Sequence, residues 1–274
     1  MNNEITVKDK VIFLTGALGL IGTEISTHFL KQGAFVALTD VDLSKADARK
    51  KELATLGIAE DQYLLLKLDI TNEENCEQAV AETINKFGRI DVLINNAAID
   101  AKFDKEGTSK VNMSRFEHYP LNALRQSVEV NLIGTVIISQ VVCRQMLKQR
   151  SGNIINVAST YSVVAPNQSL YDYGNGTKNY KPIDYIASKS FIPNFTRYLA
   201  TFYARDGIRC NAIVPHGIYN NHPESFLQNW EKLSPIGRMC DRSELDGPFT
   251  FLASDASSYM TGSVMMYDGG WTAW

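Results

Sequence analysis

Residues 11–22 read VIFLTGALGLIG and carry the clearest structural signal in the chain. The run Val11–Thr15 is apolar apart from its last residue, which is typical of a strand buried on both faces. Glycines at positions 16, 19 and 22 follow it, and a helical pattern begins at Leu20. Glycines so placed let the backbone turn tightly, approach a bound group closely and pack a helix against a strand. We therefore predict a strand, a tight turn and a helix.

The same alternation of strand and helix continues to the C-terminus. Further strands are predicted at residues 35–39, 63–68, 91–94, 153–158, 208–214 and 263–267. Helical patterns are found at residues 20–32, 43–56, 72–87, 121–149, 183–205 and 242–254. Apolar strands separated by helices imply a parallel sheet with right-handed crossovers. The prediction is an α/β fold: a single Rossmann-type doubly wound domain over residues 1–274, with a seven-stranded parallel sheet and helices on both faces.

Length and composition exclude several classes of protein. The chain has 274 residues, 45% hydrophobic content and a formal net charge of −3. It is long enough to bury a core without disulfide or metal staples, and its mild acidity disfavours a general nucleic-acid binder. Its four cysteines form no Cys-x-x-Cys pair, and we expect no metal. No apolar run of about 18 residues and no signal peptide are found, so we expect a cytoplasmic protein without a membrane span.

Three stretches lack regular patterning: residues near 97–120, 160–182 and 215–224, the last within a predicted substrate loop at 215–240. Each follows a predicted strand. Ligands bind beyond the carboxyl ends of the strands in doubly wound sheets, and long loops there are usually functional. We therefore predict that these stretches form substrate loops at one edge of the sheet.

The glycine-rich turn predicts a site for a dinucleotide. The helix after it offers free N–H groups and a partial positive charge to a pyrophosphate, which places Gly16, Leu20, Ile21 and Gly22 in the cofactor site. Asp40, at the end of the second strand, can accept hydrogen bonds from ribose hydroxyls and repels a 2′-phosphate. Neither the turn nor the first residues after that strand supply an Arg or Lys for such a phosphate. We predict NAD as the cofactor, with Asp42 as a competing ribose contact.

Two further motifs, Asn-Asn-Ala-Ala at residues 95–98 and Tyr-x-x-x-Lys at residues 185–189, complete the pattern. With the glycine turn and the ending Asp-Gly-Gly at residues 268–270, the chain resembles the short-chain dehydrogenase/reductase family over nearly its whole length. The resemblance implies that Ser159 holds the substrate oxygen and that Lys189 touches the nicotinamide ribose. It also implies that Asn131 holds a water linking Lys189 to solvent.

The residue types explain the chemistry of this motif. Tyr185 and Lys189 are four residues apart and share one helix face. A free tyrosine has a pKa near ~10, and a nearby ammonium favours the phenolate and lowers that pKa. Tyr185 is therefore predicted to exchange a proton with a secondary alcohol or ketone while hydride moves between substrate and nicotinamide.

The resemblance also implies further cofactor contacts. Asp69 and Ile70 are expected at the adenine. The second motif is expected on the adenosine side, through Asn95, Asn96, Ala97 and Ala98. The stretch Pro215, Gly217 and Ile218 is expected near the nicotinamide carboxamide. The family further implies a homodimer or homotetramer, built by pairing helices 121–149 and 183–205.

The chain departs from the common family pattern in ways that bear on the substrate. Its Gly-x-x-Gly-x-x-Gly turn is the spacing of sugar-nucleotide epimerases and dehydratases, and Ala98 replaces a usual glycine. Residues 160–182 contain an insertion between Ser159 and Tyr185. The insertion and the ending GWTAW resemble bacterial oxidoreductases of flagellin modification and nonulosonic acid synthesis. This narrower resemblance implies a sugar or sugar derivative as the small-molecule substrate.

The predicted loops hold side chains that suit such a ligand. Aromatic faces with polar tips bind polyhydroxylated molecules, and the insertion offers Tyr161, Tyr171, Tyr173 and Tyr180 with Asn167, Gln168 and Asp172. Contacts to a sugar phosphate are possible from Lys102, Lys105, Lys110, Arg115 and His118. His216 is a further candidate substrate contact.

Two alternatives to an NAD-dependent oxidoreductase remain open at this point. One is a sugar-nucleotide epimerase or dehydratase, suggested by the glycine spacing. The other is a non-catalytic NAD-binding protein. A separate structural prediction concerns Pro193, which lacks an N–H and crowds the carbonyl of Lys189. We expect the helix at residues 183–205 to bend or lose its hydrogen-bond ladder between these two residues.

Overall fold

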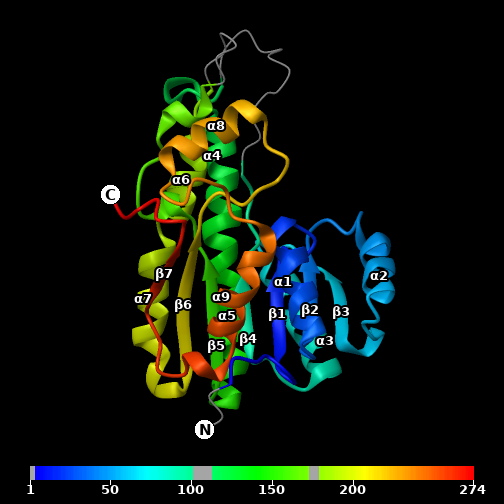
Figure 1. The fold of residues 1–274 in the computed structure, drawn as a ribbon. Coiled ribbons are helices and arrows are strands. Elements are labelled where there is room, and N and C mark those ends of the chain that lie inside the picture. The colour runs from blue at the N-terminus through cyan, green and yellow to red at the C-terminus, as the bar shows by residue number, and fades with distance from the viewer. Residues whose placement is uncertain (1–3, 101–112, 173–178) are drawn as a thin grey trace.

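The computed structural model describes residues 4–100, 113–172 and 179–274. Seven parallel strands form one sheet in the order β3-β2-β1-β4-β5-β6-β7 (Figure 1). The strands are β1 Val11–Thr15, β2 Phe35–Asp40, β3 Tyr63–Lys67, β4 Val92–Asn95, β5 Gly152–Val157, β6 Ile208–Pro215 and β7 Val264–Tyr267. The predicted seven-stranded, doubly wound parallel sheet is confirmed.

Helices cover both faces of this sheet. They are α1 Leu20–Lys31, α2 Ala46–Thr55, α3 Glu73–Phe87, α4 Leu121–Val128, α5 Thr135–Gln149, α6 Ile183–Lys189, α7 Ile192–Tyr203, α8 Glu224–Leu233 and α9 Asp246–Ala253. Side chains of β1 point alternately to the two faces. Ile12 and Leu14 join a core with α1 and α9, whereas Phe13 joins a core with α3, α5 and α7. All three β1 side chains are fully buried, as a two-sided parallel sheet requires.

The chain reverses direction across the sheet at β1, which pairs with β2 on one side and β4 on the other. In doubly wound sheets a crevice opens at this point, beyond the carboxyl ends of the strands. Helices α6 and α8 lie above the same edge (Figure 1). The fold therefore concentrates the loops after β1, β2, β4, β5 and β6 at one end of the molecule.

The predicted helix 121–149 is continuous but not uniform. Between α4 and α5 the segment Glu129–Gly134 is π-helical, a local widening common at functional sites. Among the described residues, this run alone is long and apolar enough to cross a membrane, with a mean hydropathy of 1.4. Half of its apolar window is buried inside the protein, and α5 packs against α3, β4 and β5. The apolar side chains of this run therefore contribute to the hydrophobic core.

Pro193 interrupts the helix that carries Tyr185 and Lys189, as predicted. Helix α6 ends at Lys189, and α7 begins at Ile192 with Pro193 in its first turn. Proline is tolerated there because the first N–H groups of a helix have no partner within it. The break leaves Tyr185 and Lys189 together on α6.

The substitution Pro193→Ala tests this explanation. It restores an N–H that can bond to the carbonyl of Lys189, so we expect α6 and α7 to become one ladder and the direction of α7 to change. A structure of the variant checks the ladder, and light scattering checks whether the new direction alters oligomer size. A persisting break between residues 189 and 192 would show that Pro193 is not its cause.

The region 215–240 differs from the prediction of an irregular substrate loop, because it contains α8. The helix follows Pro223 and places Phe226, Leu227, Trp230 and Leu233 at helical spacing. Phe226 and Trp230 are buried in a small core with Leu170, Tyr171, Met239 and Trp271. This amphipathic pattern was available in the sequence and identifies the helix.

Candidate active site

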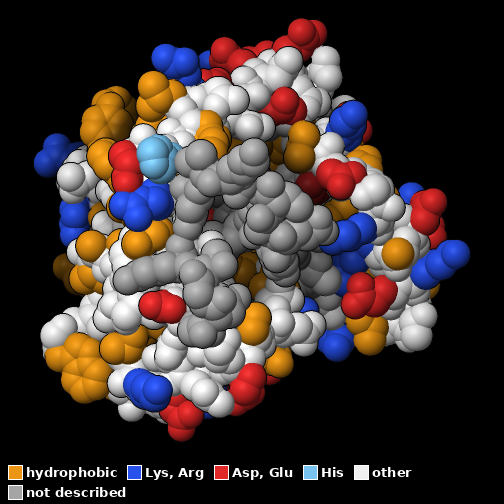
Figure 2. Space-filling model, turned by 90° about the horizontal axis from the view of Figure 1, so that it is seen from above, with side chains coloured by type: hydrophobic (Ala, Val, Ile, Leu, Met, Phe, Trp, Pro, Cys, Tyr) orange, Lys and Arg blue, Asp and Glu red, His pale blue; other side chains and the backbone are white. Residues whose placement is uncertain are grey.

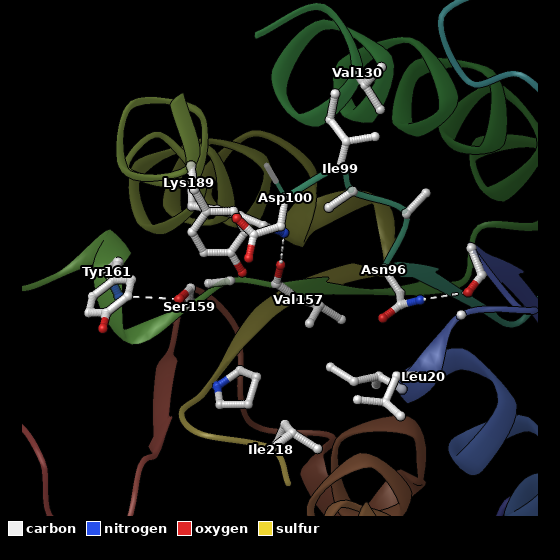
Figure 3. Close-up of a pocket in the computed structure, with 18 of the residues that line it drawn as sticks. Leu20, Asn96, Ile99, Asp100, Val130, Val157, Ser159, Tyr161, Lys189 and Ile218 are labelled. Atoms are coloured by element: carbon white, nitrogen blue, oxygen red, sulfur yellow. Dashed lines mark hydrogen bonds between the residues drawn. The ribbon is translucent and has the colours of Figure 1, made fainter. Parts of the chain in front are cut away.

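A cavity of about 1150 Å³ runs along the carboxyl edge of the sheet. It extends from the glycine-rich turn to the aromatic side chains of α8. Figure 3 shows Leu20 and Asn96 on one side of the cavity, with Ser159 and Lys189 on the other. Figure 2 looks down on this edge, and acidic and basic side chains are mixed over the described part of its surface. The volume suffices for a dinucleotide with a small substrate beside it.

The glycine-rich turn forms one wall of the cavity. Gly16, Leu20 and Ile21 line it, as predicted. Gly16 has a φ of 65°, and a Cβ there would lie 2.8 Å from the Cα of Ala97. The first N–H groups of α1 receive no side-chain cap from Gly19. These backbone groups are therefore available to an anionic ligand.

Gly22 has a packing role instead of the predicted place in the cofactor site, because it does not line the cavity. A Cβ on it would lie 2.2 Å from the carbonyl oxygen of Gly16 and 2.8 Å from the Cα of Ala17. The missing side chain lets α1 pack directly on the turn.

We expect Gly22→Ala to destabilise the protein by at least ~2 kcal/mol, since overpacked cores typically lose ~1–3 kcal/mol and the clashing atoms here are backbone. Thermal unfolding measures the loss. The matched control is Gly247→Ala in α9, where a Cβ meets nothing within 4 Å. That change should be neutral or stabilising, and equal effects of the two substitutions would contradict the packing role.

Asp40 lies at the end of β2 with its carboxylate fixed in the cavity wall. One oxygen accepts the N–H of Leu18 at 2.9 Å, and the other accepts the N–H of Asp42 at 3.1 Å. Lys45 also lines the cavity beside these acids. The expectation that no cation follows β2 at this place was therefore too narrow, because the turn before α2 brings Lys45 back.

The middle of the cavity is lined by residues after β3 and β4. Asp69, Ile70, Asn96, Ala97 and Ala98 are all there, as predicted. Asn95 is the exception: it is buried, and its amide donates to Ser139 and Asn156 in the core. The first asparagine of the motif therefore joins β4 to its neighbours, and the second faces the cavity.

Ser159, Tyr185 and Lys189 line the same end of the cavity. Ser159 follows β5, and the other two residues lie one turn apart on α6. The Ser159 hydroxyl accepts the N–H of Tyr161 at 3.2 Å, and the Ser159 side chain acts on the Tyr185 phenol. Lys189 Nζ donates to the carbonyl of Val157 at 2.8 Å (Figure 3). The fold therefore unites these three predicted residues from two separate segments.

The pKa values of this group differ from the sequence prediction. Burial raises the pKa of Tyr185 above its ordinary value, with the charge of Asp100 acting in the same direction and the Ser159 hydrogen bond opposing both. Burial lowers the pKa of Lys189 to about 8, and Asp100 opposes that shift. The predicted lowering of the Tyr185 pKa is not found in this arrangement, because desolvation of the phenol and the negative charge of Asp100 both raise it. Tyr185 is thus a protonated phenol near neutral pH.

Asn131 does not line the cavity. Its side chain in the π-helical segment accepts the N–H of Ile99 and donates to the carbonyl of Ile99 and to Ser188. Both amide N–H groups are thereby used by protein groups, and the amide oxygen accepts one hydrogen bond. It ties the end of the β4 loop to α6, next to Lys189.

The loop after β6 closes the cavity opposite α6. Pro215, Gly217 and Ile218 line it, as predicted. Gly217 has a φ of 59°, and a Cβ there would lie 2.0 Å from the indole of Trp230. Glycine at this position lets the loop pack flat against α8.

Aromatic side chains form the end wall of the cavity. Tyr161, Tyr171, His216, His222, Phe226 and Trp230 all line it. The His216 ring lies 4.4 Å from those of Trp230 and Trp271, and burial lowers the pKa of His216 to about 3. His216 is therefore neutral, and its Nε2 has no hydrogen-bond partner within the described chain.

Of the other predicted substrate contacts, those within the described residues do not line the cavity. Lys102, Lys105, Lys110 and Tyr173 lie outside the described residues. Arg115 is exposed and paired with Glu117 at 2.6 Å, and neither it nor His118 lines the cavity. Asn167 caps a short turn, and Gln168 binds the backbone of Lys181. Over residues 4–100, 113–172 and 179–274, no cluster of His, Cys, Asp or Glu suits a metal ion.

Sequence reasoning missed Asp100 and Lys181, which form an ion pair in the cavity wall. Neither belongs to a recognisable motif. Lys181 lies four residues before Tyr185, so its approach to the phenol could be anticipated only from helical spacing.

Comparisons with known proteins agree with this geometry. Residues 16–272 match the family model described as enoyl-(acyl carrier protein) reductase. The 3-oxoacyl-[acyl-carrier-protein] reductase FabG of Thermotoga maritima is 32% identical, over 96% of this chain and 98% of its own. The NAD-dependent glycerol dehydrogenase of Listeria innocua is 31% identical, over 99% and 97%. A short-chain dehydrogenase of Leptospira borgpetersenii, solved with bound NAD+, has a TM-score of 0.82 and 31% identity, over 97% and 94%.

The narrower resemblance also has a counterpart among known proteins. Post-translational flagellin modification protein A of Campylobacter coli is 27% identical, over 97% of this chain and 99% of its own. Three observations together identify the family of the whole chain: the match of the family model, the sheet order and the relatives. It belongs to the short-chain dehydrogenase/reductase family, oxidoreductases that bind a nicotinamide cofactor and act on CH–OH groups.

Proposed function

We propose that this protein is an NAD-dependent oxidoreductase acting on a secondary alcohol or ketone of a sugar or sugar derivative. The observation that carries the proposal is the shared cavity. Ser159, Tyr185 and Lys189 face the same space as the glycine-rich turn and Asp40. Reacting groups and dinucleotide-binding groups thus meet at one sheet edge.

The residues present fit NAD. The uncapped start of α1 and the close approach allowed by Gly16 suit a pyrophosphate. Asp40 offers a fixed carboxylate to ribose hydroxyls. The adenosine would lie in the part of the cavity lined by Asp69, Ile70 and the second half of the Asn-Asn-Ala-Ala motif. Pro215, Gly217 and Ile218 lie at the opposite end, where the nicotinamide would face Tyr185.

The protein's own residues would handle the proton and the substrate oxygen. A bound nicotinamide supplies the hydride donor or acceptor. Ser159 holds the substrate oxygen beside the hydroxyl of Tyr185. In reduction, Tyr185 donates its phenol proton to the carbonyl oxygen and becomes a phenolate. Oxidation is the reverse: the phenol first loses its proton to solvent, and the phenolate then accepts the alcohol proton. Lys189 binds the ribose and supplies positive charge, and Asn131 holds the adjoining loop in place.

The aromatic end wall supports a sugar-like substrate. Tyr161 lies next to Ser159, and its hydroxyl is 2.9 Å from that of Tyr171. Aromatic faces pack against the C–H surface of a sugar while their polar tips bind hydroxyls. The glycerol dehydrogenase relative is consistent with a polyhydroxylated ligand.

A substrate panel tests the proposal. Sugar alcohols, sugars, amino sugars and their phosphates are each offered with NAD and with NADP, and absorbance of the reduced nicotinamide is followed. We expect steady reduction of NAD with at least one polyol or sugar. A substrate altered without net reduction of NAD would favour the epimerase alternative. Tight NAD binding without any turnover would favour a non-catalytic protein.

We further propose that residues 1–274 form one nicotinamide-binding domain that acts in the cytoplasm as a homodimer or homotetramer. Exposed aromatic residues support pairing through the predicted helices, since Tyr198 and Phe202 of α7 are each more than half exposed. Their rings lie 5.6 Å apart and form an apolar patch. Light scattering of the purified protein measures the assembly.

A further inference from the structure

We infer that Asp100, held by Lys181, recognises a hydroxyl group adjacent to the carbon that reacts, so that the substrate is a neutral vicinal diol or polyol. This inference rests on the proposed function and narrows its substrate class. It is carried by an ion pair in the cavity wall beside Tyr185.

Lys181 is fixed against the reacting tyrosine. Its Nζ lies 4.3 Å from the centre of the Tyr185 ring, and its side chain is only 9% exposed. Gln168 binds both backbone groups of Lys181, accepting its N–H at 2.8 Å and donating to its carbonyl at 3.4 Å. The insertion between Ser159 and Tyr185 thus folds back to place one buried ammonium on the phenol.

The hydrogen bonds of Lys181 are already used. Its ammonium has three N–H groups, and it donates to both carboxylate oxygens of Asp100, at 2.7 and 2.6 Å. The remaining positive edge faces the Tyr185 ring in a cation–π contact. Lys181 therefore positions Asp100 and neutralises its charge, and it has little capacity left for a ligand.

Asp100 retains capacity to bind a ligand. A carboxylate accepts about four hydrogen bonds, and within the described residues Asp100 accepts only the two from Lys181. Its side chain is 49% exposed and lines the cavity. Asn131 binds both backbone groups of the preceding residue, Ile99, so the carboxylate is held in place. Figure 3 shows Asp100 beside Lys189, whose pKa its charge affects.

These features favour hydroxyl donors over anions. The free lone pairs of Asp100 accept O–H groups and repel a carboxylate or phosphate. The Asp100–Lys181 ion pair has no net charge, so a neutral ligand can bind beside it without leaving an unpaired charge. Lys181 Nζ lies 4.3 Å from the centre of the Tyr185 ring and 2.7 and 2.6 Å from the two carboxylate oxygens of Asp100, which places the carboxylate near the reacting carbon. A hydroxyl on the neighbouring carbon is therefore the group it would bind.

The series propan-2-ol, propane-1,2-diol and glycerol tests this inference, because it adds one vicinal hydroxyl at a time beside the same secondary carbinol. We expect kcat/KM with NAD to rise roughly 10- to 100-fold from propan-2-ol to the diol, the usual effect of one hydrogen bond to a charged group. In Asp100→Asn and Lys181→Met this gain, taken as the ratio of the two substrates within each variant, should fall below about 3-fold, most of it through KM.

The matched control is Glu117→Gln, which breaks an exposed ion pair in the following part of the same loop and should leave the series unchanged. Thermal unfolding and NAD affinity of each variant show whether the fold and cofactor site survive. Because Asp100 raises the pKa of Tyr185 and of Lys189, Asp100→Asn should also shift the pH–rate profile to lower pH.

Two results would overturn the inference while leaving the proposed function intact. One is equal kcat/KM for propan-2-ol and propane-1,2-diol in the unaltered protein. The other is preference for a hydroxy acid such as lactate over the matched diol. Failure to oxidise any alcohol in the wider panel would instead overturn the proposed function, and the inference with it.

Discussion

Replacing Tyr185 with Phe should lower turnover by ~10²- to 10⁴-fold, the usual contribution of a positioned acid or base. The ring remains to fill the cavity wall and to contact Lys181, which lies 4.3 Å from its centre. Only the hydroxyl is lost, and with it the group that would exchange a proton with the substrate. Steady-state and single-turnover rates measure the effect, and NAD affinity should remain within a few-fold of that of the unaltered protein.

The matched control is Tyr259→Phe, which removes a phenol that is fully exposed. It should leave turnover unchanged. Near-normal turnover of Tyr185→Phe would exclude proton transfer by this residue. Loss of NAD binding together with turnover would instead indicate that the hydroxyl mainly supports the cofactor site.

Cofactor preference should change most at Asp40. Its fixed carboxylate faces the place where a 2′-phosphate would lie, and like charges in contact disfavour binding by several kcal/mol. We therefore expect the unaltered protein to prefer NAD by about 10²-fold or more, on the basis that ~1.4 kcal/mol is tenfold. Asp40→Ala should weaken NAD and relieve the repulsion of NADP, where Lys45 supplies a cation for the phosphate.

Affinities of both cofactors for the variants Asp40→Ala, Asp40→Asn and Asp42→Asn measure this preference. The asparagine variant keeps an acceptor for the N–H of Leu18 and removes only the charge. If Asp42→Asn changed the preference for NAD over NADP more than the Asp40 variants do, Asp42 would be the residue that selects the cofactor. Equal or tighter binding of NADP by the unaltered protein would contradict NAD selectivity.

The sequence predicts the sheet well because two-sided burial leaves continuous apolar strands separated by helices. It also predicts that Tyr185 and Lys189 face the same space, since their spacing along α6 determines a shared face. Gly22 and Asn95 were assigned to the cofactor from their motifs, and both have structural roles. Neighbouring positions in a motif can face opposite ways, and linear order alone does not reveal which way each one points.

The remaining errors concern tertiary effects. The pKa of Tyr185 depends on burial, which a residue pair four positions apart cannot reveal. Helix α8 had an amphipathic signal, but it lay in a stretch interpreted as a loop. Asp100 and Lys181 are 81 residues apart, and only the folded insertion brings them together. Long-range polar pairs of this kind are beyond pattern reasoning on one sequence.

The most direct test of the central claim follows deuterium from substrate to cofactor. The best substrate of the panel is labelled at its reacting carbinol carbon and incubated with NAD and the protein, and mass spectrometry measures deuterium in the reduced cofactor. We predict stoichiometric transfer of the label to nicotinamide, reduced at least ~10²-fold in rate by Tyr185→Phe. A product that forms while the label stays on the substrate and NAD remains oxidised would contradict an NAD-dependent oxidoreductase.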